Sequence, residues 1–146
     1  MIAVDTNILV YAHREDTPEH ERALRALRTL DAAALGWAVP WSCVHEFFGV
    51  VTHPRIYDRP STVAEAFSAI DDLSTMGARL LSESSAHRQI LGRICEQSGF
   101  VGPRVHDARI AAICIGHGVS ELWTADRDFS YFPELKTRNP LVAPHR

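Results

Sequence analysis

Lysine is nearly absent from this chain of 146 residues. Lys136 is the only lysine, and arginine supplies the other 14 of the 15 cationic side chains. The acidic residues number 18, so the formal net charge is -3 at pH 7. The chain therefore lacks the overall positive charge that attracts many proteins to nucleic acid, and any attraction to a phosphate backbone has to be local.

Cysteine is also scarce. Cys43, Cys95 and Cys114 lie far apart, and they form neither a CxxC pair nor a Cys/His zinc pattern. Each lies in an apolar, helix-like context, so we expect reduced cysteines in the core of a cytoplasmic protein. The pattern excludes a small scaffold held together by disulfides.

Long hydrophobic runs are missing as well. Asp5 interrupts the N-terminus too early for a signal peptide, and no apolar run approaches the roughly 20 residues of a membrane span. The composition, 46% hydrophobic and 23% charged, is ordinary for a globular protein. We therefore expect a single cytoplasmic domain over residues 1–146, without a membrane segment.

What the chain does have is an alternation of short apolar strands and amphipathic helices. This alternation favours an α/β sandwich with a mainly parallel central sheet, in which ligands bind at the carboxyl ends of the strands. Thr62 and Glu65 form a capping-box pattern, and Thr6 or Asn7, Ser42, and Ser84 or Ser85 are the other expected caps. The expected strands are 2–4, 37–39, 78–81, 121–125 and 141–143, and the expected helices are 8–12, from 18 onward, 42–52, from 60 onward, from 85 to 98, and 105–115.

Four acidic residues lie where a solvated helix face does not explain them. Asp5 ends the first strand, and Asp126 follows the 121–125 strand. Glu46 lies inside a helix beside two phenylalanines, and Asp107 lies in the first turn of the most apolar helix. If the first and fourth strands are parallel neighbours, Asp5 and Asp126 lie at the same edge of the sheet.

Each acid also has a local explanation. Asp5 could cap a helix, and Asp107 could interact with a helix dipole. Glu46 could pair with an arginine such as Arg55, and Asp126 could initiate a turn. These explanations do not predict that the four acids converge on one edge of the sheet.

Carboxylates gathered in one cleft repel each other unless a cation lies between them. An oxygen-rich site without cysteine suits Mg²⁺ or Mn²⁺. Such an ion can polarise a phosphoryl oxygen and activate a bound water. The placement of the acids therefore predicts a divalent-metal site, with Asp5 left at the strand end to hold the ion.

Four segments together resemble a PIN-domain ribonuclease of the VapC type, the toxin of bacterial toxin–antitoxin pairs. They are the N-terminal VDTNILVY, the VHEFFGV around Glu46, the HDARIAA around Asp107, and the LWTADRDF around Asp126. The resemblance covers nearly the whole chain, and it depends on the ordered set because no single segment is specific. It implies a PIN-like α/β/α sandwich.

The resemblance also implies the chemistry. Asp5, Glu46, Asp107 and Asp126 would be the catalytic acids that bind Mg²⁺ or Mn²⁺, with Asp128 as a weaker candidate for the last position. The family cleaves single-stranded or looped RNA, often tRNA or ribosomal RNA. It usually forms homodimers, and a cognate antitoxin protein blocks the site.

Polar and cationic residues surround these acids. By the resemblance, Thr6, Asn7 and Thr124 would support the acids without being the principal ligands. Because an RNA backbone that approaches several carboxylates needs positive charge nearby, we also expect RNA contacts from the arginines beside the acids. These arginines are Arg104, Arg109 and Arg127.

Other classes fit less well. A haloacid-dehalogenase-like phosphatase needs a second aspartate two residues after the first, where this chain has Asn7. His106 with Asp107 suggests a metal phosphohydrolase, but the remaining histidines show no matching ligand pattern. The main alternative is a PIN-like module that binds RNA or protein without cutting, and a test of metal-dependent RNA cleavage discriminates the two.

Overall fold

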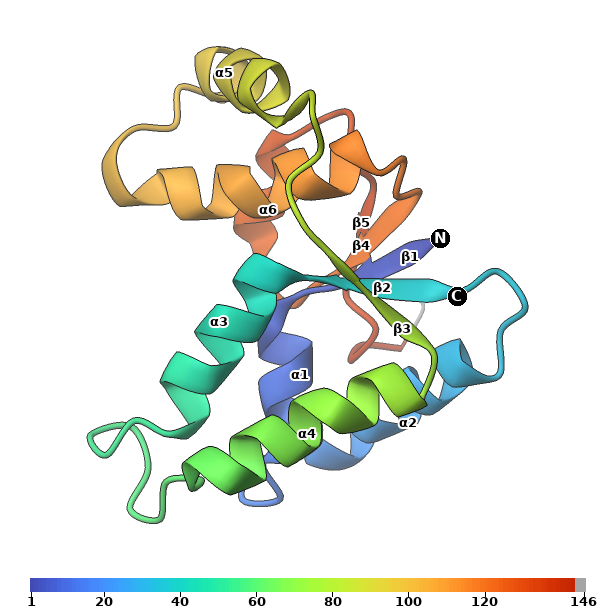
Figure 1. Cartoon of the computed structure of the whole chain (residues 1–146), viewed down its shortest axis with the longest axis vertical. Coiled ribbons are helices and arrows are strands. Elements are labelled where there is room, and N and C mark those ends of the chain that lie inside the picture. The colour runs from blue at the N-terminus through green and yellow to red at the C-terminus, as the bar shows by residue number, and fades with distance from the viewer. Residues whose placement is uncertain (144–146) are drawn as a thin grey trace.

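The computed structural model describes residues 1–143, and it shows a five-stranded sheet between two layers of helices (Figure 1). The strand order is β3-β2-β1-β4-β5, and every neighbouring pair is parallel. The elements in chain order are β1 (Ile2–Val4), α1 (Thr6–His13), α2 (His20–Asp31), β2 (Trp37–Pro40), α3 (Trp41–Val51), α4 (Val63–Thr75), β3 (Ala78–Leu81), α5 (His87–Ser98), the 3-10 helix η1 (Gly102–Arg104), α6 (Val105–Gly116), β4 (Glu121–Trp123), the 3-10 helix η2 (Arg127–Tyr131) and β5 (Thr137–Arg138). This architecture confirms the expected α/β/α sandwich.

Different helices cover the two faces of the sheet. Helices α5 and α6 pack on each other over one face of the sheet, while α1, α2 and α4 lie on the other (Figure 1). Helix α6 is apolar nearly all round because it is enclosed by α5 and the sheet, and residues 110–114 are all buried. No helix within residues 1–143 is both long and apolar enough to cross a membrane.

Parallel pairing brings the ends of the two central strands together. The register aligns Val4 of β1 with Trp123 of β4, and the Asp5 N–H donates to the Trp123 carbonyl at 3.0 Å. The residues that follow these strands, Asp5 and Thr124, therefore lie side by side at the carboxyl edge of the sheet. The topology thus creates the place where the acids can meet.

Several expected boundaries are wrong. Residues 141–143 form no strand, because Asn139 accepts from the Leu141 N–H at 3.0 Å and Pro140 has no N–H to donate to a ladder. The last strand is instead β5, earlier in the chain. The fourth strand is also shorter than expected and ends at Trp123.

The helix starts are corrected in the same way. Asp5, not Thr6 or Asn7, caps α1, and α2 begins at His20 rather than Pro18. Helix α3 begins directly after β2, so Pro40 takes the cap position expected of Ser42. Ala86 takes the position expected of Ser84 or Ser85.

The expected capping box is confirmed. The Thr62 hydroxyl accepts from the Glu65 N–H and the Glu65 carboxylate accepts from the Thr62 N–H, both at 3.1 Å.

The three cysteines are free thiols: Cys43 and Cys114 are buried, and Cys95 is only half-buried.

Candidate active site

Asp5 lies at the junction of β1 and α1, where it is only 4% exposed. Its Oδ1 accepts from the Thr6 N–H at 2.8 Å, and its Oδ2 accepts from the Thr124 hydroxyl at 2.7 Å. The Cys43 thiol also donates to Oδ1, at 3.6 Å. The carboxylate therefore has a fixed orientation at the end of the strand.

Burial has a large effect on this group. Desolvation raises the pKa of Asp5 to about 6, although the hydrogen bonds from Thr124 and Thr6 act in the opposite direction. The nearby Glu46 carboxylate raises this pKa further. A cation beside Asp5 would remove the cost of keeping the group ionised.

Glu46 extends from α3 toward Asp5 and is exposed. Its Oε2 accepts a hydrogen bond of 2.7 Å from the Thr6 hydroxyl. The alternative in which Glu46 pairs with Arg55 is wrong, because Glu46 has no ion-pair partner within residues 1–143. Thr6 thus links Glu46 to Asp5 through two successive bonds, one from its hydroxyl and one from its N–H.

Asp107 and Asp126 come from other elements, α6 and the cap of η2. Asp107 lies in the first turn of α6 and is half-buried, and desolvation raises its pKa. The carboxylates of Asp126, Glu46 and Asp128 raise it further, while Arg104 lowers it. These three carboxylates therefore lie near enough to Asp107 to disfavour its ionised form.

Asp128, the weaker candidate in the sequence, lies close to Asp107 and Asp126. Asp126 caps η2 by accepting from the Asp128 N–H at 2.9 Å, and this turn directs both carboxylates toward Asp107. One carboxylate oxygen from each of Asp107, Asp126 and Asp128 lies within 4.8 Å of the others. Asp128 therefore forms a compact acidic cluster with Asp107 and Asp126, although its side chain is exposed.

The expected polar support residues form a connected network. The Asn7 amide nitrogen lies 3.4 Å from both Asp5 Oδ2 and the Thr124 hydroxyl, and the Asn7 amide oxygen accepts from the Ala125 N–H at 3.2 Å. The Thr124 hydroxyl also accepts from the Asp126 N–H at 2.9 Å. The backbone of Asp126 is thereby tied to Asp5.

All four expected acids line one open cavity of about 350 Å³. The donor set is entirely oxygen, which is the set preferred by hard divalent cations such as Mg²⁺ or Mn²⁺. The desolvated Asp5 and the mutually repelling acids around Asp107 gain stability from a cation, so these residues fit such an ion. The other residues of the lining are Thr6, Asn7, Val10, Tyr11, Val50 and Tyr57.

The sequence patterns did not single out the two tyrosines of this lining. The Tyr57 ring lies under the Arg14 guanidinium, whose central carbon is 3.9 Å from the ring centroid. Arg14 is itself nearly buried and is held by the Asp16 carboxylate and the Arg59 carbonyl. Helical periodicity carries no signal for this arrangement, because it joins two loops distant in sequence.

The three expected arginines have different environments. Arg104 stacks on the Phe100 ring at 3.7 Å, and Arg109 forms an ion pair with Glu83. Arg127 is exposed and forms no ion pair with any residue from 1 to 143. Two of the three therefore already have intramolecular partners.

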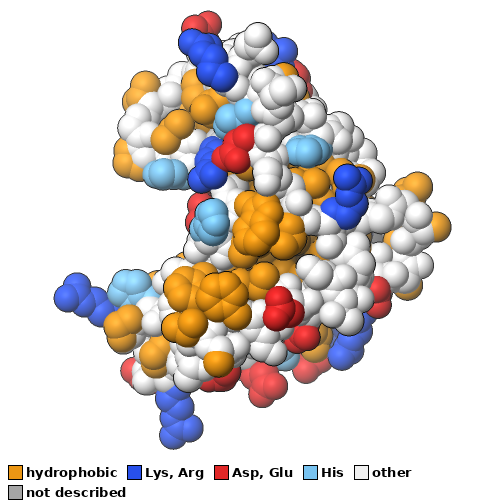
Figure 2. Space-filling model, in the orientation of Figure 1, with side chains coloured by type: hydrophobic (Ala, Val, Ile, Leu, Met, Phe, Trp, Pro, Cys, Tyr) orange, Lys and Arg blue, Asp and Glu red, His pale blue; other side chains and the backbone are white. Residues whose placement is uncertain are grey.

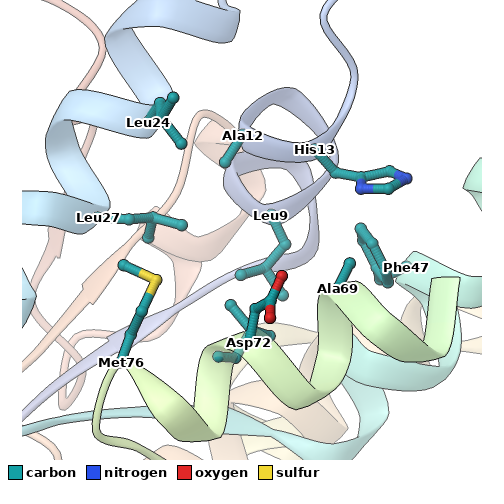
Figure 3. A pocket seen from close by; sticks show the side chains of 10 residues that line it. Leu9, Ala12, His13, Leu24, Leu27, Phe47, Ala69, Asp72 and Met76 are labelled. Atoms are coloured by element: carbon teal, nitrogen blue, oxygen red, sulfur yellow. The ribbon is translucent and has the colours of Figure 1, made fainter. Parts of the chain in front are cut away.

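A separate apolar pocket of about 160 Å³ lies between α1, α2 and α4 (Figure 3). Leu9, Leu24 and Leu27 point into it, and Met76 closes one side. It includes none of the four acids at the sheet edge. Its chemistry is therefore unlike that of the acidic cavity.

Comparison with known proteins identifies the family of the chain. The PIN domain family matches residues 2–135. Ribonuclease VapC43 of Mycobacterium tuberculosis is 33% identical to this chain over 144 residues, which are 97% of this chain and 96% of the relative.

Solved structures show the same fold. VapBC2 from Rickettsia felis, bound to a promoter DNA fragment, superposes with a TM-score of 0.69 at 23% identity, covering 95% of this chain and 98% of that one. VapC20 of Mycobacterium tuberculosis, described as a sarcin-ricin loop cleaving toxin, gives 0.67 at 16% identity and covers 93% and 99%. The chain belongs to the PIN domain family, and its curated relatives are VapC ribonucleases.

Proposed function

We propose that this protein is a metal-dependent endoribonuclease that acts as the toxin of a toxin–antitoxin pair. The observation that carries the proposal is the convergence of Asp5, Glu46, Asp107 and Asp126 on one cavity at the carboxyl edge of the sheet. Membership of the PIN domain family and the ribonuclease naming of the relatives support it. The proposed ion is Mg²⁺ or Mn²⁺.

In this proposal the four acids hold the ion, with Asp128 positioned to join them. A bound divalent cation polarises a phosphoryl oxygen and lowers the pKa of a coordinated water. Thr124 and Thr6 hold Asp5 and Glu46 in position through the 2.7 Å hydrogen bonds that their hydroxyls donate. The exposed carboxylate of Asp128 lies on the solvent side, where a substrate strand would approach.

The proposed substrate is single-stranded or looped RNA, with tRNA and ribosomal RNA as the first candidates. The naming of VapC20 as a toxin that cleaves the sarcin-ricin loop supports a structured RNA loop as one such target. Arg104, Arg109 and Arg127 are the proposed RNA-contacting cations. The proposed partners are a second copy of this chain and a cognate antitoxin, in keeping with the VapBC complexes among the structural neighbours.

The direct test incubates the full chain with end-labelled total tRNA and ribosomal RNA in Mg²⁺, in Mn²⁺ and in EDTA. Discrete cleavage that requires the cation and disappears in Asp126→Asn is the expected result. RNA binding without cleavage in either cation would instead support the non-cutting PIN-like module. Cleavage that persists in EDTA would contradict the metal-dependent proposal.

A further inference from the structure

A second cavity of about 250 Å³ adjoins the acidic cavity, and four of its five lining residues carry hydrogen-bond donors. Ser42, His45, His106 and Arg109 line it, together with Glu46. Glu46 also lines the acidic cavity, so the two cavities meet at this residue. Figure 2 shows a hollow between the α5–α6 and α3–α4 parts of the surface, where histidine, basic and acidic side chains gather.

Ser42 is the unusual member of this cavity. The residue is only 5% exposed, and its hydroxyl has no hydrogen-bond partner within the part of the chain that the structure describes. A buried hydroxyl without a protein partner costs stability, and a ligand that accepts its hydrogen bond would offset that cost. Because Ser42 lines this cavity, an acceptor bound there is the partner available to its hydroxyl.

The start of α3 adds to the donor set. Ser42 lies in the first turn of α3, whose cap residue Pro40 provides no side-chain hydrogen bond. The first N–H groups of a helix have no partner within the helix, and they carry partial positive charge. This end of α3 therefore favours an anion beside Ser42.

The remaining lining residues also donate. Arg109 uses Nε and Nη2 to bind Glu83, which leaves its Nη1 hydrogens for the cavity. The rings of Trp41 and His45 lie with their centroids 6.0 Å apart, and this contact orients the imidazole. Glu83 is engaged with Arg109, and the Glu46 carboxylate accepts from Thr6. The cavity is thus lined mainly by donors.

We infer that the Ser42–His45–His106–Arg109 cavity binds a phosphate group of the RNA strand, next to the phosphate that lies in the acidic cavity. This inference rests on the proposed function, because it takes the substrate to be RNA. It assigns Ser42, His45 and His106 to substrate positioning. It also assigns Arg109 to one defined phosphate and not to the RNA backbone in general. The cavity would fix which phosphodiester faces the acids.

The decisive variant is Ser42→Ala. Removal of a buried hydroxyl that lacks a partner leaves the melting temperature unchanged or higher, whereas removal of a hydrogen bond to phosphate weakens RNA binding roughly three- to tenfold. Binding is measured by fluorescence anisotropy with a fluorescein-labelled, mixed-sequence decaribonucleotide, with Ca²⁺ in place of Mg²⁺. Lower stability with unchanged affinity would overturn the inference.

A matched pair of arginine variants tests the charge. Arg109 pairs with Glu83 and Arg93 pairs with Glu134, and both pairs are on the surface, but Arg93 lines neither cavity. Arg109→Gln is expected to weaken binding about tenfold and to reduce the log–log salt slope by about 0.7. Arg93→Gln is expected to keep the wild-type affinity and slope. Equal effects in the two variants would overturn the inference.

The same measurements separate this inference from the nuclease proposal. If the wild type binds the decaribonucleotide but cleaves no RNA, and Ser42→Ala still weakens binding, the phosphate cavity stands and the nuclease proposal fails. If the wild type cleaves RNA and Ser42→Ala and Arg109→Gln bind and cut like the wild type, the cavity is no subsite. A wild type that does not bind the decaribonucleotide overturns the inference outright.

Discussion

At the scale of single residues, the site depends on the burial of Asp5. Two strong hydrogen bonds, from the Thr6 N–H and the Thr124 hydroxyl, stabilise the ionised carboxylate. They do not offset its desolvation, because the pKa of Asp5 remains raised to about 6. The metal-free protein therefore holds this residue at an energetic cost, as is common for residues retained for function.

Asp5→Asn should abolish RNA cleavage without loss of stability. The amide keeps the shape of the side chain and removes a desolvated charge that Glu46 repels. Cleavage in excess Mg²⁺ and thermal melting of the metal-free protein are the two measurements. Retained cleavage would exclude Asp5 as a metal ligand, and a lower melting temperature would contradict the electrostatic explanation.

The pH dependence of stability should follow from the same shift. Because the pKa of Asp5 is raised from 3.8 to about 6 on folding, its protonated form adds stability that is fully present below the unfolded pKa. This stability is lost as the pH rises through about 6, and its size is on the order of 2–3 kcal/mol. Urea unfolding in EDTA across this range measures it, with Asp5→Asn as the control. Asp107 also has a raised pKa and adds a pH dependence of its own. The prediction for Asp5 is contradicted if the stability of the wild type and of Asp5→Asn depends on pH in the same way.

Thr124→Val should weaken metal binding while leaving the fold intact. Valine preserves the volume but removes the donor to Asp5 Oδ2 and the acceptor for the Asp126 N–H. Groups that orient metal ligands commonly change affinity 10- to 100-fold, so we expect about a tenfold loss of Mn²⁺ affinity by calorimetry. Thr29→Val, on the exposed side of α2, is the matched control. Equal Mn²⁺ affinity in the two variants would contradict the role assigned to Thr124.

At the scale of elements, stability and activity are separable. Helix α4 begins at the capping box of Thr62 and Glu65 and lies away from the acidic cavity. The acids instead come from the ends of β1 and β4 and from the helices α3 and α6. A change at the start of α4 should therefore affect folding and not chemistry.

Thr62→Ala tests this separation. Loss of the cap should lower the free energy of unfolding by about 1 kcal/mol. The melting temperature should fall by roughly 2–4 °C, and RNA cleavage at 25 °C should stay at the wild-type level. Thr75→Ala, at the other end of the helix, is the control and should have little effect. A large loss of activity in Thr62→Ala would show that α4 contributes to the site.

At the scale of the whole molecule, a broad apolar area lies over α3 and α4 (Figure 2). The Phe48 and Phe67 rings pack against each other across the two helices, and Phe67 is 54% exposed. Val63 and Trp41 are exposed as well, at 58% and 38%. Exposed apolar areas of this kind are typical of surfaces that bind another protein.

We expect the isolated protein to form a homodimer of twice 16.3 kDa. The physical reason is that association would remove the exposed apolar surface from water. Size-exclusion chromatography with light scattering at about 100 µM measures the mass. Phe67→Glu should shift the equilibrium toward the monomer, whereas Ala33→Glu, at an exposed position after α2, is a control for added charge. A wild type that is monomeric at this concentration would contradict the prediction.

Local patterns in the sequence predicted most of the elements and singled out the four acids that line one cavity in the structure. The strand pattern alone predicts that a carboxylate such as Asp5 lies directly after an apolar strand. The capping box at Thr62 is equally local. The helix starts at α2, α3 and α5 were placed less well, because the turn geometry that sets them depends on the neighbouring strand or loop.

The sequence by itself determined the class of the protein: a parallel α/β/α fold with an oxygen-donor acidic site. Only the tertiary structure decided the depth to which Asp5 is buried, the link from Thr6 to Glu46, and the entry of Asp128 into the compact cluster. It also decided that Arg109 pairs with Glu83 and lines a cavity with Ser42. These features join residues that are far apart in the chain and depend on strand register and helix packing, which local periodicity does not encode.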